Sequence, residues 1–92
     1  MIELEKDIEQ TFVDWVIRQR GITYKWEGSR KKLDRIVVTS TGNILLIEFK
    51  KKTGSKLSPH QKRIVTEMGY RNAPVLVTNN VEEAKRFYKE HC

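Results

Sequence analysis

At 92 residues the chain is long enough for one domain but not two, and its 38% hydrophobic and 33% charged residues are typical of a globular protein, which excludes a disordered chain. The longest apolar run, Ile44 to Ile47, is far shorter than a membrane span of roughly 20 residues, and one cysteine excludes a disulfide framework. Since the N-terminus is acidic rather than signal-like, we expect a single cytoplasmic domain over residues 1–92 with no membrane partner.

The first predicted element is an amphipathic helix from Glu3 to Arg20. Leu4, Ile8, Phe12 and Trp15 recur at helical spacing, and Val13, Val16 and Ile17 widen the apolar stripe beyond one face. Gly21 is expected to end the helix. The alternation from Ile22 to Glu27 then predicts a strand with one face in water.

A β-hairpin is predicted next, from two β-rich runs at Leu33–Thr39 and Ile44–Lys50. The residues between them, Ser40 to Asn43, include the glycine and asparagine that tight turns favour. Both runs are apolar on both faces at their centres, so we expect helices to cover both sides of the sheet.

The remaining elements are a helix, a strand and a helix. Ser58 suits the N-cap, Pro59 the first helical position and Gln61 the third position of a capping box, in a helix that ends at Gly69. A strand follows at Ala73–Thr78, and Asn79 or Asn80 caps a final helix over Val81–Glu90. The order α-β-β-β-α-β-α predicts an α/β fold with a mixed sheet.

The positive charge is concentrated in the middle of the chain. The net charge is +6, and between residues 30 and 63 the acidic residues are Asp34 and Glu48 alone. The basic residues of that region are Arg30, Lys31, Lys32, Arg35, Lys50, Lys51, Lys52, Lys56, Lys62 and Arg63. This distribution favours binding of a nucleic acid over a merely solvated surface.

Asp34, Glu48 and Lys50 form the candidate catalytic group. A turn centred on Thr41 places Asp34 opposite Glu48, and Lys50 shares the face of Glu48 because side chains alternate along a strand. Paired carboxylates repel, and Mg²⁺ or Mn²⁺ would relieve that repulsion. Such a cation would polarise a phosphate, which Lys50 would contact. Spacing alone leaves a simpler interpretation open, in which each carboxylate pairs with a nearby arginine or lysine.

Asp34 followed by Glu48-Phe49-Lys50 resembles the D-(x)n-(E/D)-x-K pattern of the PD-(D/E)xK nucleases. With Leu57-Ser58-Pro59-His60-Gln61 downstream, the chain is similar to the VRR-NUC family (virus-type replication-repair nucleases) in its standalone, phage-type form, which implies a phage gene in a bacterial host. The resemblance implies a restriction-endonuclease-like fold and DNA cleavage. The Gly and Pro that precede the catalytic Asp in that family are Lys31 and Leu33 here, which puts the geometry of this loop in question.

The resemblance also implies a set of site residues. Asp34, Glu48, the backbone carbonyl of Phe49 and Glu9 would hold the cation, and Lys50 and Gln61 would complete the catalytic group. Glu5 lies one turn before Glu9 and is the alternative helix acid. Gln61 has its capping role as an alternative. Contacts to DNA are expected from Ser29, Arg30, Lys31, Lys32, Lys51, Lys52, Lys56 and Ser58.

We expect the partner to be branched DNA, cut as by a four-way-junction resolvase, and the protein to be a homodimer. The dimer is inferred from the small size of the domain and the second apolar side of the first helix. The alternatives are a non-catalytic nucleic-acid-binding module, a flap or nicking nuclease, and a binder of a protein partner. Trp15, Tyr24, Trp26 and Tyr70 are interpreted as core or interface residues, with base stacking as the alternative.

Overall fold

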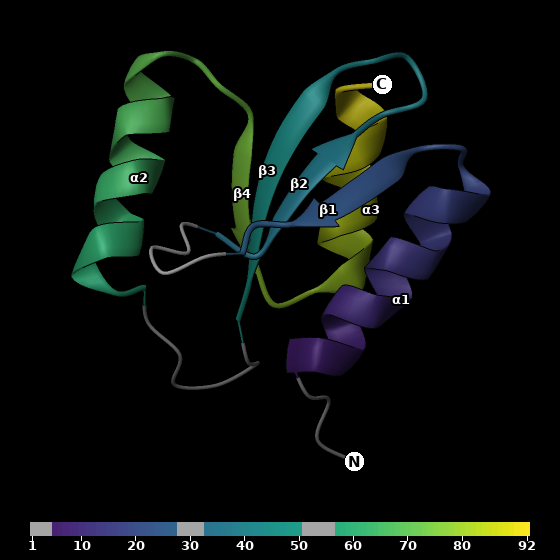
Figure 1. Ribbon diagram of the computed structural model, residues 1–92, viewed down its shortest axis with the longest axis horizontal. Helices are drawn as coiled ribbons and strands as arrows, with labels where there is room; N and C mark the ends of the chain where they lie inside the picture. The colour runs from purple at the N-terminus through teal and green to yellow at the C-terminus, as the bar shows by residue number, and fades with distance from the viewer. Residues whose placement is uncertain (1–4, 28–32, 51–56) are drawn as a thin grey trace.

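The computed structural model describes residues 5–27, 33–50 and 57–92 (Figure 1). Within these ranges the helices and strands follow the order α-β-β-β-α-β-α, as the sequence predicts. Their bounds are α1 Glu5–Arg18, β1 Ile22–Lys25, β2 Arg35–Val38, β3 Ile44–Phe49, α2 Pro59–Tyr70, β4 Val75–Thr78 and α3 Val81–Glu90.

The four strands form one mixed sheet in the order β1-β2-β3-β4. β1, β2 and β3 are antiparallel neighbours, whereas β4 runs parallel to β3. A parallel neighbour requires a crossover connection, and α2 provides it. The α/β fold with a mixed sheet is therefore confirmed.

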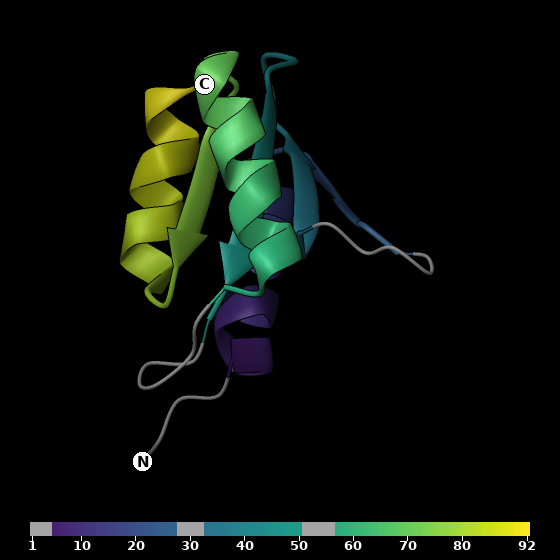
Figure 2. The same ribbon diagram turned by 90° about the vertical axis from the view of Figure 1, so that its left-hand side faces the viewer.

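The helices lie on both faces of the sheet, also as predicted. α1 and α3 pack together on one face, and α2 lies on the other (Figures 1 and 2). The two faces are covered unequally, because α2 packs against β4 whereas α1 contacts both β1 and β3. None of the helices in the described ranges is long and apolar enough to cross a bilayer.

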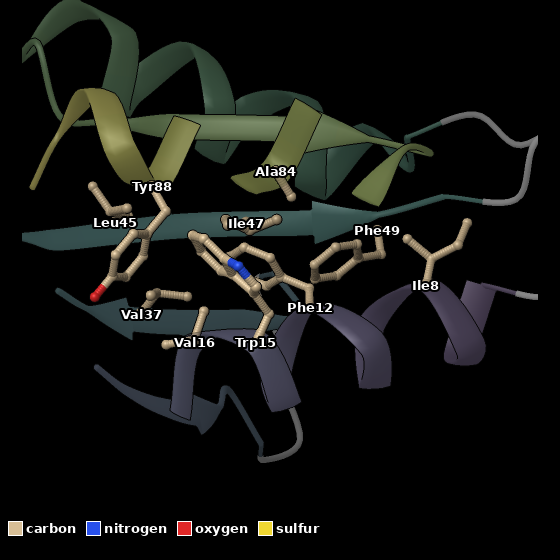
Figure 3. Packing of buried hydrophobic residues seen from close by; sticks show 10 residues of the cluster. All are labelled: Ile8, Phe12, Trp15, Val16, Val37, Leu45, Ile47, Phe49, Ala84 and Tyr88. Carbon is tan, nitrogen blue, oxygen red and sulfur yellow. The ribbon is translucent and has the colours of Figure 1, made fainter. Parts of the chain in front are cut away.

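The hydrophobic core lies between the sheet and the α1–α3 pair. Alternate residues of β3 point into it, and the rings of Phe49 and Phe12 meet with centroids 5.7 Å apart. Figure 3 shows how the cluster brings the two helices onto β2 and β3. Its buried members are Ile8, Phe12, Trp15, Val16, Val37, Leu45, Ile47, Phe49, Ala84 and Tyr88.

Gly21 follows α1 for a different reason from the one predicted. The residue with positive φ is Arg20, at 67°, and the Gly21 N–H donates to the Val16 carbonyl at 2.9 Å, so that the two residues form a Schellman-type end. Gly21 is required for space: a Cβ there would lie 2.7 Å from Cγ1 of Val16 and 2.9 Å from the Val38 carbonyl oxygen.

The prediction that Gly69 ends the second helix is wrong. α2 continues to Tyr70, and the left-handed residue after it is Asn72, with φ 56°. Asparagine tolerates this conformation because its short polar side chain bonds locally. At the start of α3, Asn80 is the N-cap, since its side chain accepts from the Glu83 N–H at 3.0 Å.

Candidate active site

Asp34 and Glu48 lie next to each other at one end of the β2–β3 hairpin. Arg35 pairs with Ile47 in the observed register, so Asp34, one residue before β2, lies opposite Glu48 as predicted. Oδ2 of Asp34 accepts from the Phe49 N–H at 2.8 Å. The two side chains are only 6% and 3% exposed. The hairpin therefore holds two carboxylates together in a place that water barely reaches.

Lys50 and Gln61 complete a hydrogen-bonded cluster around Glu48. Oε2 of Glu48 lies 3.1 Å from Nζ of Lys50 and accepts from Nε2 of Gln61 at 2.9 Å. Nζ of Lys50 also donates to Oε1 of Gln61 at 3.1 Å. Three of the residues expected in the catalytic group thus bond directly to one another, and the fourth, Asp34, is adjacent.

The start of α2 is fastened to this cluster through Gln61. Its backbone N–H donates to the Ser58 hydroxyl and its Oε1 accepts from the Ser58 N–H, both at 3.1 Å, which forms the capping box that the sequence predicts. The Gln61 side chain therefore caps the helix and contacts Glu48 and Lys50 at the same time. Both interpretations of this residue are compatible with the geometry.

Glu48 is electrostatically strained. Its pKa is raised above the ordinary value of 4.5, first by burial and then by the negative charge of Asp34, while Lys50 and Gln61 act in the opposite direction. Within the described part of the chain, its buried Oε1 has no hydrogen-bond partner. A buried carboxylate oxygen without a partner costs free energy that a bound cation would recover.

Glu9 lies apart from this pair. It forms an ion pair with Arg35, Nε to Oε2 at 2.6 Å, and Arg35 also donates to the Thr23 hydroxyl at 3.3 Å. Arg35 alternates with Ile36 along β2 and so points to the α1 side of the sheet, away from Glu48. Among the described residues, no three acidic, histidine or cysteine side chains are grouped to hold a metal ion. Glu5 opens α1, and the structure describes nothing of its side chain.

Of the residues expected to contact DNA, Ser58 alone lies in the described ranges. Ser29, Arg30, Lys31, Lys32, Lys51, Lys52 and Lys56 lie outside the described residues. The Ser58 hydroxyl accepts from the Gln61 N–H and so caps α2.

Sequence reasoning missed the role of Arg35, which it counted among the basic residues expected to favour nucleic-acid binding and as a possible partner for Asp34. The available signal was its spacing from Val37: two residues before a core position, Arg35 had to point to the face that α1 covers. The arginine therefore neutralises Glu9 rather than either carboxylate of the hairpin.

No family model matches the sequence, and neither does any curated protein. A solved structure described as a "VRR_NUC domain" is similar to this chain, with a TM-score of 0.81 and 22% sequence identity over 96% of this chain and 97% of that one. The chain therefore has the fold of a VRR_NUC domain, which is the fold that its motifs predict.

Proposed function

We propose that the protein is a metal-dependent endonuclease that hydrolyses phosphodiester bonds in DNA. The observation that carries the proposal is the buried pair of Asp34 and Glu48 with Lys50 beside it, where one Glu48 oxygen has no hydrogen-bond partner among the residues that the structure describes. The similarity to a VRR_NUC domain, whose name denotes a nuclease, and the net charge of +6 support it.

The donor set fits Mg²⁺ or Mn²⁺. Carboxylate and carbonyl oxygens are the ligands that these hard cations prefer, and Asp34, Glu48 and the Phe49 backbone carbonyl would supply them. The cation, when bound, supplies the positive charge that polarises a phosphate and lowers the pKa of a water molecule. Asp34 is already oriented, because its Oδ2 is held by the Phe49 N–H.

Lys50 and Gln61 then act on the phosphate and its surroundings. The ammonium group of Lys50 is fixed by Glu48 and Gln61, and from there it would contact a non-bridging oxygen of the scissile phosphate and stabilise the developing charge. Gln61 would orient the attacking water through its amide. Glu9 would join the cation only after leaving Arg35, so we assign it a smaller contribution than Asp34 or Glu48.

The acidic pair also separates this proposal from its rivals. A non-catalytic nucleic-acid-binding module gains nothing from two buried carboxylates facing phosphates, because they repel the ligand. A binder of a protein partner has no use for the unpartnered oxygen of Glu48. A flap or nicking nuclease uses the same chemistry and differs only in the DNA that it accepts.

We further propose a homodimer that cuts four-way junctions, because resolving a junction takes two symmetric cuts and one Asp34–Glu48 site makes one. The dimer was expected from a second apolar side of the first helix, and the burial of α1 bears on that expectation. The described part of α1 buries Val13 and Val16, and only Ile17 of its apolar residues remains exposed, at 60%. α1 therefore lacks the second apolar side on which the predicted dimer rested, and the proposal now rests on the two cuts.

Incubation of the purified chain with labelled duplex, flap and four-way-junction DNA, in Mg²⁺, Mn²⁺ or EDTA, tests the function. We expect cleavage of branched DNA in either metal and none in EDTA. Cleavage in EDTA would contradict the metal mechanism, and tight binding without cleavage in any metal would favour the non-catalytic module. Light scattering with and without junction DNA tests the dimer: a chain that stays monomeric would leave a nickase.

A further inference from the structure

Two aromatic residues, Tyr24 in β1 and Trp26 just after it, share a sheet face with the acidic pair. Tyr24 lies opposite Ile36, which lies opposite Leu46. Beyond β1 the pairing continues, because the Trp26 N–H donates to the Asp34 carbonyl at 3.2 Å, so Trp26 lies beside Asp34. Thr23, the residue before Tyr24, accepts a hydrogen bond from Arg35 on the α1 side. Tyr24 and Trp26 therefore point to the opposite face, that of Asp34 and Glu48.

Among the described elements, no helix is packed over this face of the sheet at β1. α2 packs against β4, and Figure 2 shows β1 emerging beside the helix rather than behind it. Tyr24 is 57% exposed and Trp26 is partly exposed. In the ranges that the structure describes, neither ring contacts another aromatic ring, whereas Trp15 and Tyr88 meet edge to face in the core. The rings of Tyr24 and Trp26 thus lie outside the aromatic packing of the core.

We propose that Tyr24 and Trp26 stack on unpaired bases of the DNA strand whose phosphate binds at Asp34 and Glu48. This inference rests on the proposed function and names the substrate feature that the site selects. Neighbouring strands are about 4.8 Å apart and alternate residues on one strand about 7 Å apart. The two rings therefore lie about one to two nucleotide steps from a phosphate at Asp34, since stacked bases rise about 3.4 Å each.

Only unpaired bases fit these rings. In a duplex each base face is covered by the next base pair, so a protein ring can stack only where bases are splayed out. Flaps and open branch points provide such bases, whereas continuous duplex does not. Stacking needs no base-edge contact and so tolerates any sequence. The two aromatics would therefore make the enzyme selective for structure without making it selective for sequence.

The same face also carries two exposed aliphatic residues farther from the site, Ile22 and Ile44. A second copy of the chain is therefore the alternative occupant of this face. DNA is the better occupant at Tyr24 and Trp26 for two reasons. Trp26 is continuous with the acidic pair, lying opposite Asp34. The chain also carries a net charge of +6, which draws a polyanion.

Binding without cleavage tests the proposal. Asp34→Asn provides a background that keeps an acceptor for the Phe49 N–H, and EDTA removes metal. The probes are a splayed duplex with unpaired thymidines and one 2-aminopurine, and a fully paired duplex of equal length. We expect Trp26→Ala and Tyr24→Ala each to weaken binding of the splayed probe about tenfold and that of the paired probe less than about twofold.

The controls separate stacking from general effects. Trp26→Phe and Tyr24→Phe keep a ring and are expected to keep most of the affinity and of the 2-aminopurine quenching. Tyr70→Ala removes a ring that is 83% exposed at the far end of α2, and it should change nothing. Circular dichroism confirms that each variant is folded.

Unchanged binding of the splayed probe by both alanine variants, or an equal loss for both probes, would overturn the proposal. A change in sedimentation with protein concentration in Tyr24→Ala, without loss of DNA binding, would instead make this face a contact between copies. The outcomes for the two proposals are separable. Normal metal-dependent cleavage by the unaltered chain with no stacking overturns only this inference, and stacking without any cleavage overturns only the nuclease function.

Discussion

The two faces of the sheet differ in how completely a carboxylate is paired. On the α1 side, Glu9 is paired with Arg35 at 2.6 Å, and Arg35 also bonds Thr23. On the α2 side, Glu48 shares one oxygen with Lys50 and Gln61 and, within the described residues, leaves the other oxygen buried without a partner. The first arrangement is a closed ion pair, whereas the second has a buried oxygen that the proposed cation would bind.

The difference shows that the α1 side of the sheet contributes stability to this small domain, whereas the α2 side loses some at the acidic pair. The α1 side holds the aromatic and aliphatic core. The α2 side places Asp34 next to Glu48, whose pKa is raised by burial and by that neighbour. A structure that retains such a repulsive pair is typical of a functional site. Changes on the two faces should therefore affect different measurements.

The largest effect on stability is expected from Phe12→Ala on the α1 side. Phe12 is fully buried, stacks on Trp15 and packs at a tilt against Phe49, so its loss leaves a cavity that costs about 3–5 kcal/mol. The melting temperature should fall by more than about 10 °C. The cleavage rate per folded molecule, measured well below that temperature, should stay near that of the unaltered chain. A stable variant with no activity would show that the two faces are not separable.

Lys50→Ala should have the next largest effect, this time on catalysis. Removing one group that stabilises transition-state charge costs about a hundredfold in turnover. Binding of DNA in EDTA should weaken only slightly, because other basic residues share the attraction. Single-turnover kinetics with saturating enzyme separate the two. Wild-type cleavage by this variant would remove Lys50 from the mechanism.

A smaller effect is expected from Glu9→Gln. The amide keeps an acceptor for Arg35 and loses the charge, and because Arg35 already neutralises Glu9, cleavage should fall by no more than about tenfold. Equal losses at Glu9 and Glu48 would place Glu9 in the cation site and would require its ion pair with Arg35 to open.

The smallest predicted effect is a pH-dependent gain in stability from Glu48→Gln. Because the folded-state pKa of Glu48 is raised above 4.5, ionising it costs free energy in the folded chain but not in the unfolded one. The stability of the unaltered protein therefore falls as pH rises from about 4.5 through the raised folded-state pKa of Glu48, and it stays lower at higher pH. Without metal, the variant should melt at a higher temperature than the unaltered chain at pH 7, and at the same temperature below pH 4.5. A variant that is less stable at pH 7 would contradict the assigned strain.

The parts of the fold that depend on local chemistry were predictable from sequence. The turn centred on Thr41 fixed the register that brings Asp34 to Glu48, because a two-residue period leaves no freedom once the turn is placed. Ser58, Pro59 and Gln61 predicted the start of α2 by the same kind of local hydrogen bonding.

The parts of the fold that depend on contacts between distant residues were not predictable from the sequence. The need for Gly21 arises from Val16, Tyr88 and Val38, which come from three separate elements. Arg20 and Asn72 take the left-handed conformation after α1 and α2. A prediction that places glycine at this position does not identify either residue. Of the extra apolar residues of α1, Val13 and Val16 are buried within the chain and Ile17 stays exposed, because the sequence does not reveal how much of a helix its own chain will cover.

The most direct test of the account is the cleavage rate of Asp34→Asn and Glu48→Gln on a flap or four-way junction across a series of Mn²⁺ concentrations. Both amides keep the shape of the side chain and remove the charge that would bind the cation. We predict rates at least about a thousandfold below that of the unaltered chain at every concentration, a loss of about 4 kcal/mol, with DNA binding in EDTA unchanged or tighter. Cleavage by either variant at the rate of the unaltered chain would contradict the account.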